Sequence, residues 1–311
     1  MLSILKLIRF PNLVMIAITM YAFRFLVIKP YYGMSGTEFQ MDSISYGLMT
    51  FVTMLIAVSG YVSNDYFDRE IDLINKPGRP SVSGKIKDGS LLASASMVSI
   101  FCLAGMIYLS IRLNSVIPSI VLGFALFTTW WYSLVLKRSF VWGNLAVSFM
   151  TSCTLGMAWF FEWLLLKESK PGLYETATIT AIAIGICFFA FLLSMMRELV
   201  KDLEDIDGDK AFGCRSIPIV MGISRSKMLI YIISILLYFS LIYCQLWLKN
   251  NNFLLVIIWL VLAVELPLLF FLIRLRSAET SLQFHKASSQ LKRIMAGGIA
   301  TMAVIWLNLR F

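Results

Sequence analysis

Acidic residues gather in two short segments of the chain that have the same spacing. Ten of the 18 Asp and Glu residues lie within residues 64–72 and 197–209. Both segments contain the pattern D-x-x-D-x-x-x-D, formed by Asp65, Asp68 and Asp72 (the first acidic cluster) and by Asp202, Asp205 and Asp209 (the second acidic cluster). Steps of three and four residues place the three carboxylates of a cluster on one face of a helix.

Carboxylates this close together repel one another, so a cation is needed to hold them. Aspartate oxygens suit Mg²⁺, which usually completes its shell with water and substrate phosphates. We therefore expect all six aspartates to bind Mg²⁺, and the metal to bind a diphosphate. Basic residues near the clusters would contact the remaining phosphate oxygens: Arg79, Lys137, Arg138 and Arg215.

The alternative is that these acids are solvated side chains of loops, and two copies with identical spacing argue against it. Glu204 and Asp207 point away from the acidic face and are expected to be solvated. The lone histidine, His285, is given no role.

The elements that position these clusters are membrane spans. The chain has 311 residues, of which 59% are hydrophobic and 14% charged. Its mean hydropathy is +0.80. Soluble domains carry roughly 25% charged residues, so this composition excludes an ordinary soluble enzyme and a disordered chain. Nine apolar runs approach the length of a bilayer crossing: Pro11–Ile28, Ile44–Asn64, Gly89–Ile111, Leu113–Leu136, Ser139–Phe161, Thr176–Met196, Met228–Leu248, Asn250–Ile273 and Ile294–Leu309.

The basic residues indicate how these spans are oriented. With nine crossings, 20 of the 27 Lys and Arg fall on one side of the membrane and 6 on the other. Because cytoplasmic loops carry the excess of Lys and Arg, the N-terminus and both acidic clusters are expected to face the cytoplasm from a cell membrane. This orientation of the spans accounts for the net charge of +9, so no nucleic acid partner is expected. The five scattered cysteines are interpreted as small core residues.

Two charges interrupt the spans. Glu265 lies mid-span, two residues before Pro267, and a structural role is expected for it, although an intramembrane acid is a functional candidate by default. Arg24 lies in the first span, where it either snorkels outward or meets a buried acid.

The two clusters form an internal repeat with an offset of 137 residues. This predicts an all-α, multipass membrane bundle with two pseudo-repeated halves, in a single domain that covers residues 1–311. A rival class is a cation or metabolite transporter, but a transporter places its charges near the bilayer midplane, whereas these acids lie at one membrane face. An inactive scaffold is expected to have lost some of the aspartates, and all six are present.

At these residues the sequence resembles the UbiA superfamily of intramembrane prenyltransferases. The first family signature, N-x-x-x-D-x-x-x-D, matches Asn64, Asp68 and Asp72, and it continues into Asn75 and Arg79-Pro80. The second signature matches Asp205 and Asp209, followed by Gly213 and Arg215. A Tyr-Ser…Leu-Lys-Arg segment, residues 132–138, is a third family feature. The resemblance covers nearly the whole chain.

The resemblance implies a Mg²⁺-dependent reaction in which an allylic polyprenyl diphosphate loses diphosphate and an acceptor captures the allylic cation. It implies catalytic roles for Asp68, Asp72, Asp205 and Asp209. Four residues join the diphosphate-binding set on the same ground: Asn64, Asn75, Tyr132 and Lys201.

The acceptor is predicted from residues 197–205. This segment resembles the branch of the family that joins geranylgeranyl diphosphate to geranylgeranylglyceryl phosphate, a lipid acceptor, and so makes an ether lipid. Arg197 and Lys201 would suit a phosphorylated acceptor, unless both pair with neighbouring acids on the same helix. An aromatic acceptor, as in quinone-type biosynthesis, stays open.

Overall fold

The computed structural model describes residues 2–82, 88–166 and 173–309, and in these ranges the chain is built of helices without strands. The predicted all-α class is confirmed. The charge count above includes five residues that lie outside the described ranges: Lys85, Lys87, Lys167, Lys170 and Arg310.

Eight helical stretches in the described ranges are long and apolar enough to cross a membrane. They are Phe10–Ser35, Ser43–Phe67, Gly89–Arg112, Ile117–Leu134, Trp142–Leu165, Thr176–Glu204, Ile223–Asn250 and Leu254–Arg276. The ninth predicted run lies in α15 (Ser281–Asn308), which has 28 residues. Its first half carries His285, Lys286, Lys292 and Arg293, so the helix as a whole is less apolar than the other eight.

The chain divides into two compact units that are not successive halves of the sequence. The first unit contains residues 1–20, 39–146 and 207–215. Its helices are α1 (Leu2–Leu7), most of α2 (Phe10–Ala22), α4 (Ser43–Phe67), α5 (Arg69–Asn75), α6 (Asp88–Arg112), α7 (Ile117–Leu134), the 3₁₀ turn η2 (Leu136–Arg138) and most of α10 (Ile206–Ala211). A segment from the second acidic cluster therefore belongs to the unit that holds the first.

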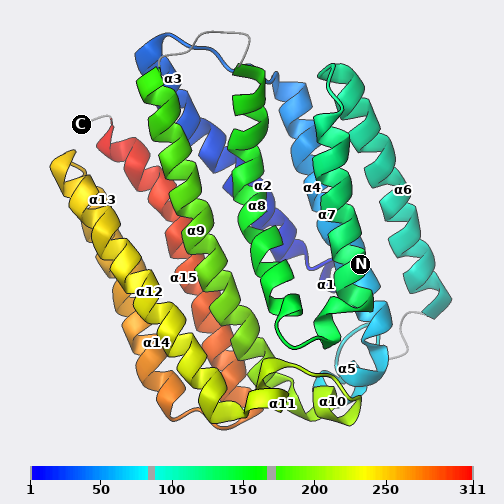
Figure 1. The fold of residues 1–311 in the computed structure, drawn as a ribbon. Coiled ribbons are helices and arrows are strands. Elements are labelled where there is room, and N and C mark those ends of the chain that lie inside the picture. Colours follow the sequence, from blue (N-terminus) through cyan, green and yellow to red (C-terminus); the bar gives the residue numbers. More distant parts are fainter. Residues whose placement is uncertain (1, 83–87, 167–172, 310–311) are drawn as a thin grey trace. The chain divides into compact units, whose positions relative to one another are not determined.

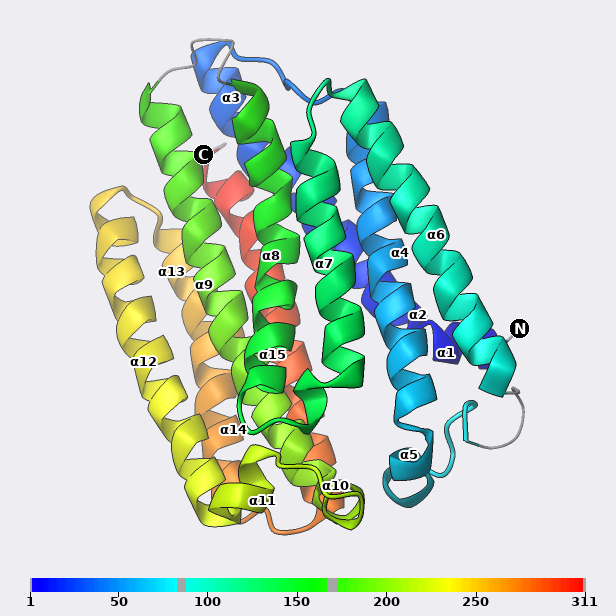
Figure 2. The ribbon, with the colours of Figure 1, turned by 45° about the vertical axis from the view of Figure 1, so that its right-hand side comes forward.

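In the first unit, α4, α6 and α7 lie side by side (Figures 1 and 2). Small residues allow the close approach, since a Cβ added at Gly105 of α6 would lie 2.6 Å from Val52 Cγ2 of α4. The indole of Trp130 donates to the hydroxyls of both Ser59 and Ser99 at 3.0 Å. These three side chains tie α7 to α4 and α6.

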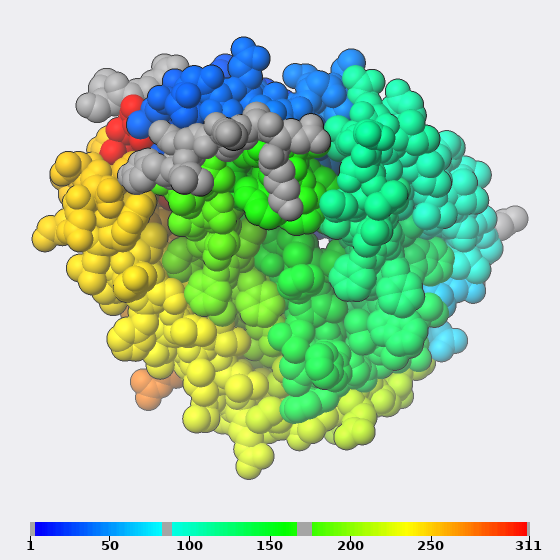
Figure 3. Space-filling model, turned by 45° about the horizontal axis from the view of Figure 1, so that its top comes forward, coloured from blue at the N-terminus to red at the C-terminus, as the bar shows by residue number. Residues whose placement is uncertain are grey.

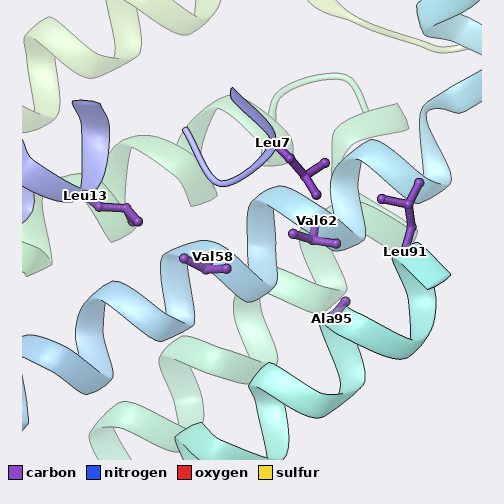
Figure 4. Packing of buried hydrophobic residues seen from close by; sticks show 6 residues of the cluster. All are labelled: Leu7, Leu13, Val58, Val62, Leu91 and Ala95. Atoms are coloured by element: carbon purple, nitrogen blue, oxygen red, sulfur yellow. The ribbon is translucent and has the colours of Figure 1, made fainter. Parts of the chain in front are cut away.

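The cytoplasmic end predicted for the first unit has a small apolar core of its own (Figure 4). Its buried side chains come from α1, α2, α4 and α6, and they are Leu7, Leu13, Val58, Val62, Leu91 and Ala95. This core holds the short helix α1 against α4, so that the polar residues of α1 keep a fixed place next to the first acidic cluster.

The second unit contains the remaining helices, which are η1 (Phe23–Ile28), α3 (Lys29–Ser35), most of α8 (Trp142–Leu165), α9 (Leu173–Glu204), α11 (Ile217–Met221), α12 (Ile223–Asn250), α13 (Leu254–Leu260), η4 (Val261–Glu265), α14 (Leu266–Arg276) and α15. In it, α15 packs against α9, α13 and α14, and α9 also packs against α12. The outer side of α12, yellow in Figure 3, carries exposed apolar side chains such as Phe239 and Tyr243, as a surface in contact with lipid would.

Two segments of the second unit, η1 and η4, have π-helical hydrogen bonding. Glu265 ends η4, and its carboxylate accepts a hydrogen bond from Gln245 Nε2. The hydroxyl of Tyr238 donates to the Glu265 carbonyl oxygen at 2.7 Å. Because a π turn frees backbone carbonyls, these bonds support the structural role expected for Glu265. Arg24 lies in η1 and is buried rather than snorkelling outward.

Candidate active site

The first acidic cluster lies where α4 meets α5. Asp68 sits between the two helices with φ −94° and ψ 2°. Hydrogen bonds still continue across this junction, from Asp68 N to Asn64 O at 2.9 Å and from Asp72 N to Asp68 O at 2.8 Å. All three aspartates of the cluster are buried, as the shared face predicts.

Cations of the chain itself bind these three carboxylates. Arg9 binds Asp65 at 2.9 Å, and Lys137 binds Asp68. Arg79 binds both Asp72 and Asp65, the latter at 3.4 Å. The repulsion expected from the sequence is thus relieved by three basic side chains, of which Arg79 and Lys137 were predicted at the site and Arg9 was not.

The short helix α10 brings Asp209 into the same unit and fixes it there. The Gly208 N–H donates to Asn75 Oδ1 at 2.8 Å, which links α10 to α5. The Arg215 N–H donates to the Arg138 carbonyl oxygen at 3.0 Å, which links the end of this segment to η2. A side chain at position 208 would displace Asn75, because a Cβ there would lie 2.5 Å from Asn75 Nδ2.

Lys137 is the centre of this group of charges. Burial acts to lower its pKa, but the carboxylates of Asp68, Asp209 and Asp72 together raise the pKa of Lys137 above its ordinary value. Burial raises the pKa of Asp72, and the charges of Arg79, Lys137 and Lys76 offset part of that rise. The ammonium is therefore held charged among three acids from two distant parts of the sequence.

The other residues of the second acidic cluster differ from Asp209. Asp202 and Asp205 belong to the second unit and are only partly buried, whereas Asp209 is buried. The two clusters therefore share a spacing but not a pattern of burial. The helix also breaks within the second cluster, since α9 ends at Glu204 and α10 begins at Ile206.

One neighbouring acid, Glu198, binds both basic residues of this segment. Lys201 Nζ binds Glu198 Oε1 at 2.7 Å and Oε2 at 3.0 Å. Arg197 binds the same carboxylate at 3.3 Å. This is the helix pairing that the sequence left open as the alternative to an acceptor phosphate.

The structure places the remaining predicted residues as follows. Asn64 donates its side-chain amide to Asp68. Tyr132 is half-buried in α7, next to Ser133, whose hydroxyl hydrogen-bonds Ser63 at 3.2 Å. Arg138 and Arg215 are exposed. All four of these predicted residues belong to the first unit.

One expectation on solvation is wrong. The Glu204 side chain is only 12% exposed, and its carboxylate binds His285 Nδ1 at 2.9 Å. The prediction considered only the face of the residue's own helix, whereas α15 packs against α9 and brings His285 to the Glu204 carboxylate. Asp207 is exposed, as expected.

The donor chemistry of the first cluster fits a hard cation. In the described ranges no three His, Cys, Asp or Glu side chains are close enough to hold a metal ion, and the acids of this cluster bind basic side chains. The donors are nevertheless all oxygens, and Asn64 Oδ1 is buried without a hydrogen-bond partner in the described part of the chain. Asp68, Asp72 and Asn64 are the residues present that would hold such an ion.

A model of the UbiA prenyltransferase family matches residues 31–290 of the chain. The chain belongs to the UbiA prenyltransferase family. The resemblance inferred from the signatures is thereby confirmed. The chain is an integral membrane protein, and eight helices within its described ranges are long and apolar enough to cross a bilayer.

Relatives within the UbiA family carry a more specific name. The chain is 35% identical, over 182 residues, to digeranylgeranylglyceryl phosphate synthase of Methanothermobacter thermautotrophicus. That match covers 58% of this chain and 58% of the relative, less than two thirds of its length.

Solved structures share the fold. One, described as giving structural and mechanistic insights into the biosynthesis of digeranylgeranylglyceryl phosphate synthase in membranes, has a TM-score of 0.59 and 24% identity, with 99% of this chain and 97% of that chain covered. Another, a UbiA homologue from Archaeoglobus fulgidus bound to DMAPP and Mg²⁺, has a TM-score of 0.53 and 15% identity, with 96% and 98% covered. At these identities the likeness establishes the UbiA fold.

Proposed function

We propose that this UbiA-family protein transfers a polyprenyl group from an allylic prenyl diphosphate, such as geranylgeranyl diphosphate, to geranylgeranylglyceryl phosphate, and so makes an ether lipid. The observation that carries the proposal is the buried group of Asp68, Asp72 and Asp209 around Lys137. The name of the Methanothermobacter relative supports this acceptor, and the DMAPP and Mg²⁺ in the Archaeoglobus homologue support this donor class and metal.

The residues of the site have complementary roles in this proposal. Asp68, Asp72 and Asn64 hold Mg²⁺, which, when bound, neutralises charge on the departing diphosphate. Lys137 and Arg79 donate hydrogen bonds to phosphate oxygens. Each cation then exchanges a carboxylate partner for a phosphate partner and stays paired with a negative charge. Asn75 keeps Asp209 in place through Gly208.

The bond changes balance without a further reactant. The allylic C–O bond breaks and the electron pair leaves with the diphosphate. The acceptor hydroxyl oxygen then forms the new C–O bond, and its proton passes to the released diphosphate. Because the negative charge develops on the leaving group, preorganised cations at Lys137 and Arg79 lower the barrier.

The proposal includes further elements that come from the sequence. We place the whole of residues 1–311 in one catalytic domain, with the acidic clusters at the cytoplasmic face, as the distribution of Lys and Arg favours. Asp202 and Asp205 stay in the proposed metal-binding set, and Tyr132, Arg138, Lys201 and Arg215 in the diphosphate-binding set.

The test is transfer activity of the purified protein in detergent. The protein is incubated with Mg²⁺, radiolabelled geranylgeranyl diphosphate, and either geranylgeranylglyceryl phosphate or an aromatic quinone precursor. We expect ether-lipid product that is lost on chelation with EDTA and restored by Mg²⁺. Product only with the aromatic precursor would reassign the acceptor, and no product with any acceptor would refute the proposal.

A matched pair of variants on α10 tests the site. Asp209→Asn is expected to lower turnover at least a hundredfold, since it removes one of the charges around Lys137. Asp207→Asn removes the same charge from an exposed position two residues away and should retain activity. Equal activity of the two variants would remove Asp209 from the site.

A further inference from the structure

A basic cavity of about 280 Å³ lies in the first unit, between α1, α4 and the segment after α5. Its size is close to the roughly 300 Å³ at which small-molecule sites begin. The charged side chains that line it are Lys6, Arg9, Asp65, Lys76 and Arg79. Four cations face one carboxylate there, a balance that suits an anion and not a metal ion.

Two of the cations are held in place by the one acid. Asp65 binds the guanidinium groups of both Arg9, at 2.9 Å, and Arg79, at 3.4 Å. Asp72, outside the lining, also binds Arg79, so two carboxylates offset two of the four positive charges and the lining keeps an excess of positive charge. Because Arg and Lys are the usual partners of phosphate oxygens, a phosphate group is the anion that this arrangement favours.

The backbone at Arg9 is strained in a way that serves this cavity. Arg9 has φ 51°, in the left-handed region that non-glycine residues rarely adopt. This conformation separates α1 from α2 and lets the guanidinium reach Asp65 while it stacks over the Tyr61 ring at 4.5 Å. Strained residues of this kind persist where surrounding contacts hold them, and they cluster at binding sites.

Arg79 links the cavity to the proposed diphosphate site. Arg79 binds Asp65 on the cavity side, and it also binds Asp72 of the acidic cluster. A second anion bound by Lys6 and Arg9 would therefore lie next to the donor diphosphate. The other cations suggested for an acceptor, Arg197 and Lys201, bind Glu198.

We propose that the basic cavity binds the phosphate monoester of the acceptor, with Lys6 and Arg9 as its specific partners. This inference rests on the proposed function. It makes Lys6 and Arg9 determinants of acceptor specificity, whereas Lys137 serves the donor. Neither Lys6 nor Arg9 belongs to a family signature described above.

The test compares two acceptors that differ only in the phosphate, geranylgeranylglyceryl phosphate and the corresponding alcohol. Lys6→Gln removes one exposed charge of the cavity, and Arg69→Gln removes a charge from α5 outside it. We expect Lys6→Gln to raise KM for the phosphorylated acceptor about tenfold, the loss of one charge-assisted hydrogen bond. The KM for geranylgeranyl diphosphate, and activity with the alcohol, should not change. Arg69→Gln should match the unmodified protein.

Other outcomes overturn the inference. A rise in KM for the diphosphate would assign the cavity to the donor. An equal loss with both acceptors, or a loss only in micelles that contain anionic lipid, would assign it to a membrane headgroup. Absence of any effect in both Lys6→Gln and Arg9→Gln would leave the cavity without this role. If the unmodified protein prenylates neither acceptor, the proposed function itself fails. If it prenylates the phosphorylated acceptor and the variants show no effect, only the role of the cavity fails.

Discussion

Replacing Gly208 with alanine tests how the chain positions Asp209. The added Cβ would lie 2.5–2.6 Å from the side-chain atoms of Asn75. The Asn75 side chain must therefore turn away, and its 2.8 Å hydrogen bond from Gly208 N is lost. Leaving a buried N–H without a partner costs about 1–3 kcal/mol. Alanine regains up to ~1 kcal/mol of helix propensity.

The net change in stability is therefore small, about 0–2 kcal/mol. Turnover should suffer more, because α10 carries Asp209 and has lost its link to α5. We expect kcat to fall by at least tenfold while the thermal midpoint in detergent changes by only a few degrees. Both are measured on the same purified sample.

A double-variant cycle isolates the contact. Asn75→Ala loses the same hydrogen bond but leaves room for a Cβ at residue 208. The double variant should therefore be no less stable than Asn75→Ala alone. The summed losses in unfolding free energy of the two single variants should exceed the loss in the double variant by about 1–3 kcal/mol. Additive losses in stability and in kcat would refute the argument that Asn75 and Gly208 act through one contact.

Three further predictions concern other parts of the chain. Asp42→Ala should destabilise the protein by about 1 kcal/mol, since Asp42 caps α4 by accepting from Ile44 N at 2.9 Å and Ser45 N at 3.1 Å. The hydrogen bond from the Ser45 hydroxyl, and after it those from the backbone and Arg112, lower the pKa of Asp42 to about 2. The difference in stability between the unmodified protein and Asp42→Ala should therefore be full above pH 4 and shrink as the pH falls toward 2, as measured by thermal melts. Lys137→Gln should abolish diphosphate binding and destabilise the protein by about 3 kcal/mol or more, because three acids lose their shared cation; a stable variant with intact binding of radiolabelled diphosphate would contradict this. Glu265→Gln should keep both activity and melting temperature, because the amide can still accept from Gln245, and a loss of turnover at unchanged stability would give Glu265 a functional role.

The spacing of the acids was enough to predict much of the candidate site. Steps of three and four residues placed Asp65, Asp68 and Asp72 on one buried face, because the helical hydrogen bonds continue through Asp68. The contribution of Arg9 had no such signal. It depends on a left-handed backbone at a residue type that rarely adopts one, and on a partner 56 residues away.

The prediction for Glu204 failed because it considered one helix alone, whereas α15 packs against α9 and brings His285 to the Glu204 carboxylate. The break at Asp205 was also not predicted, and it changes the direction of the side chains beyond it. Nothing in the residues 197–209 marks that break, since no Pro lies there and the one Gly follows it. The spans were easier to predict, because length and hydropathy are properties of the run itself and do not depend on tertiary contacts.

The π-helical segment η1 also constrains how this protein tolerates insertions and deletions. In η1 the Lys29 N–H bonds to the Arg24 carbonyl oxygen, five residues earlier, so this turn holds one residue more than an α-helical turn. The helix that follows carries two buried tyrosines, Tyr31 and Tyr32, and the Tyr32 ring packs edge-on against Trp159 at 6.4 Å between centroids. Deleting a single residue from 23–28 would convert the turn to α-helix and leave the residues after it in the same orientation, because the π turn is what accommodates the extra residue. Both tyrosines would then keep their packing, and for that reason a one-residue gap among relatives with this packing is expected within this turn and not in the α-helix on either side of it.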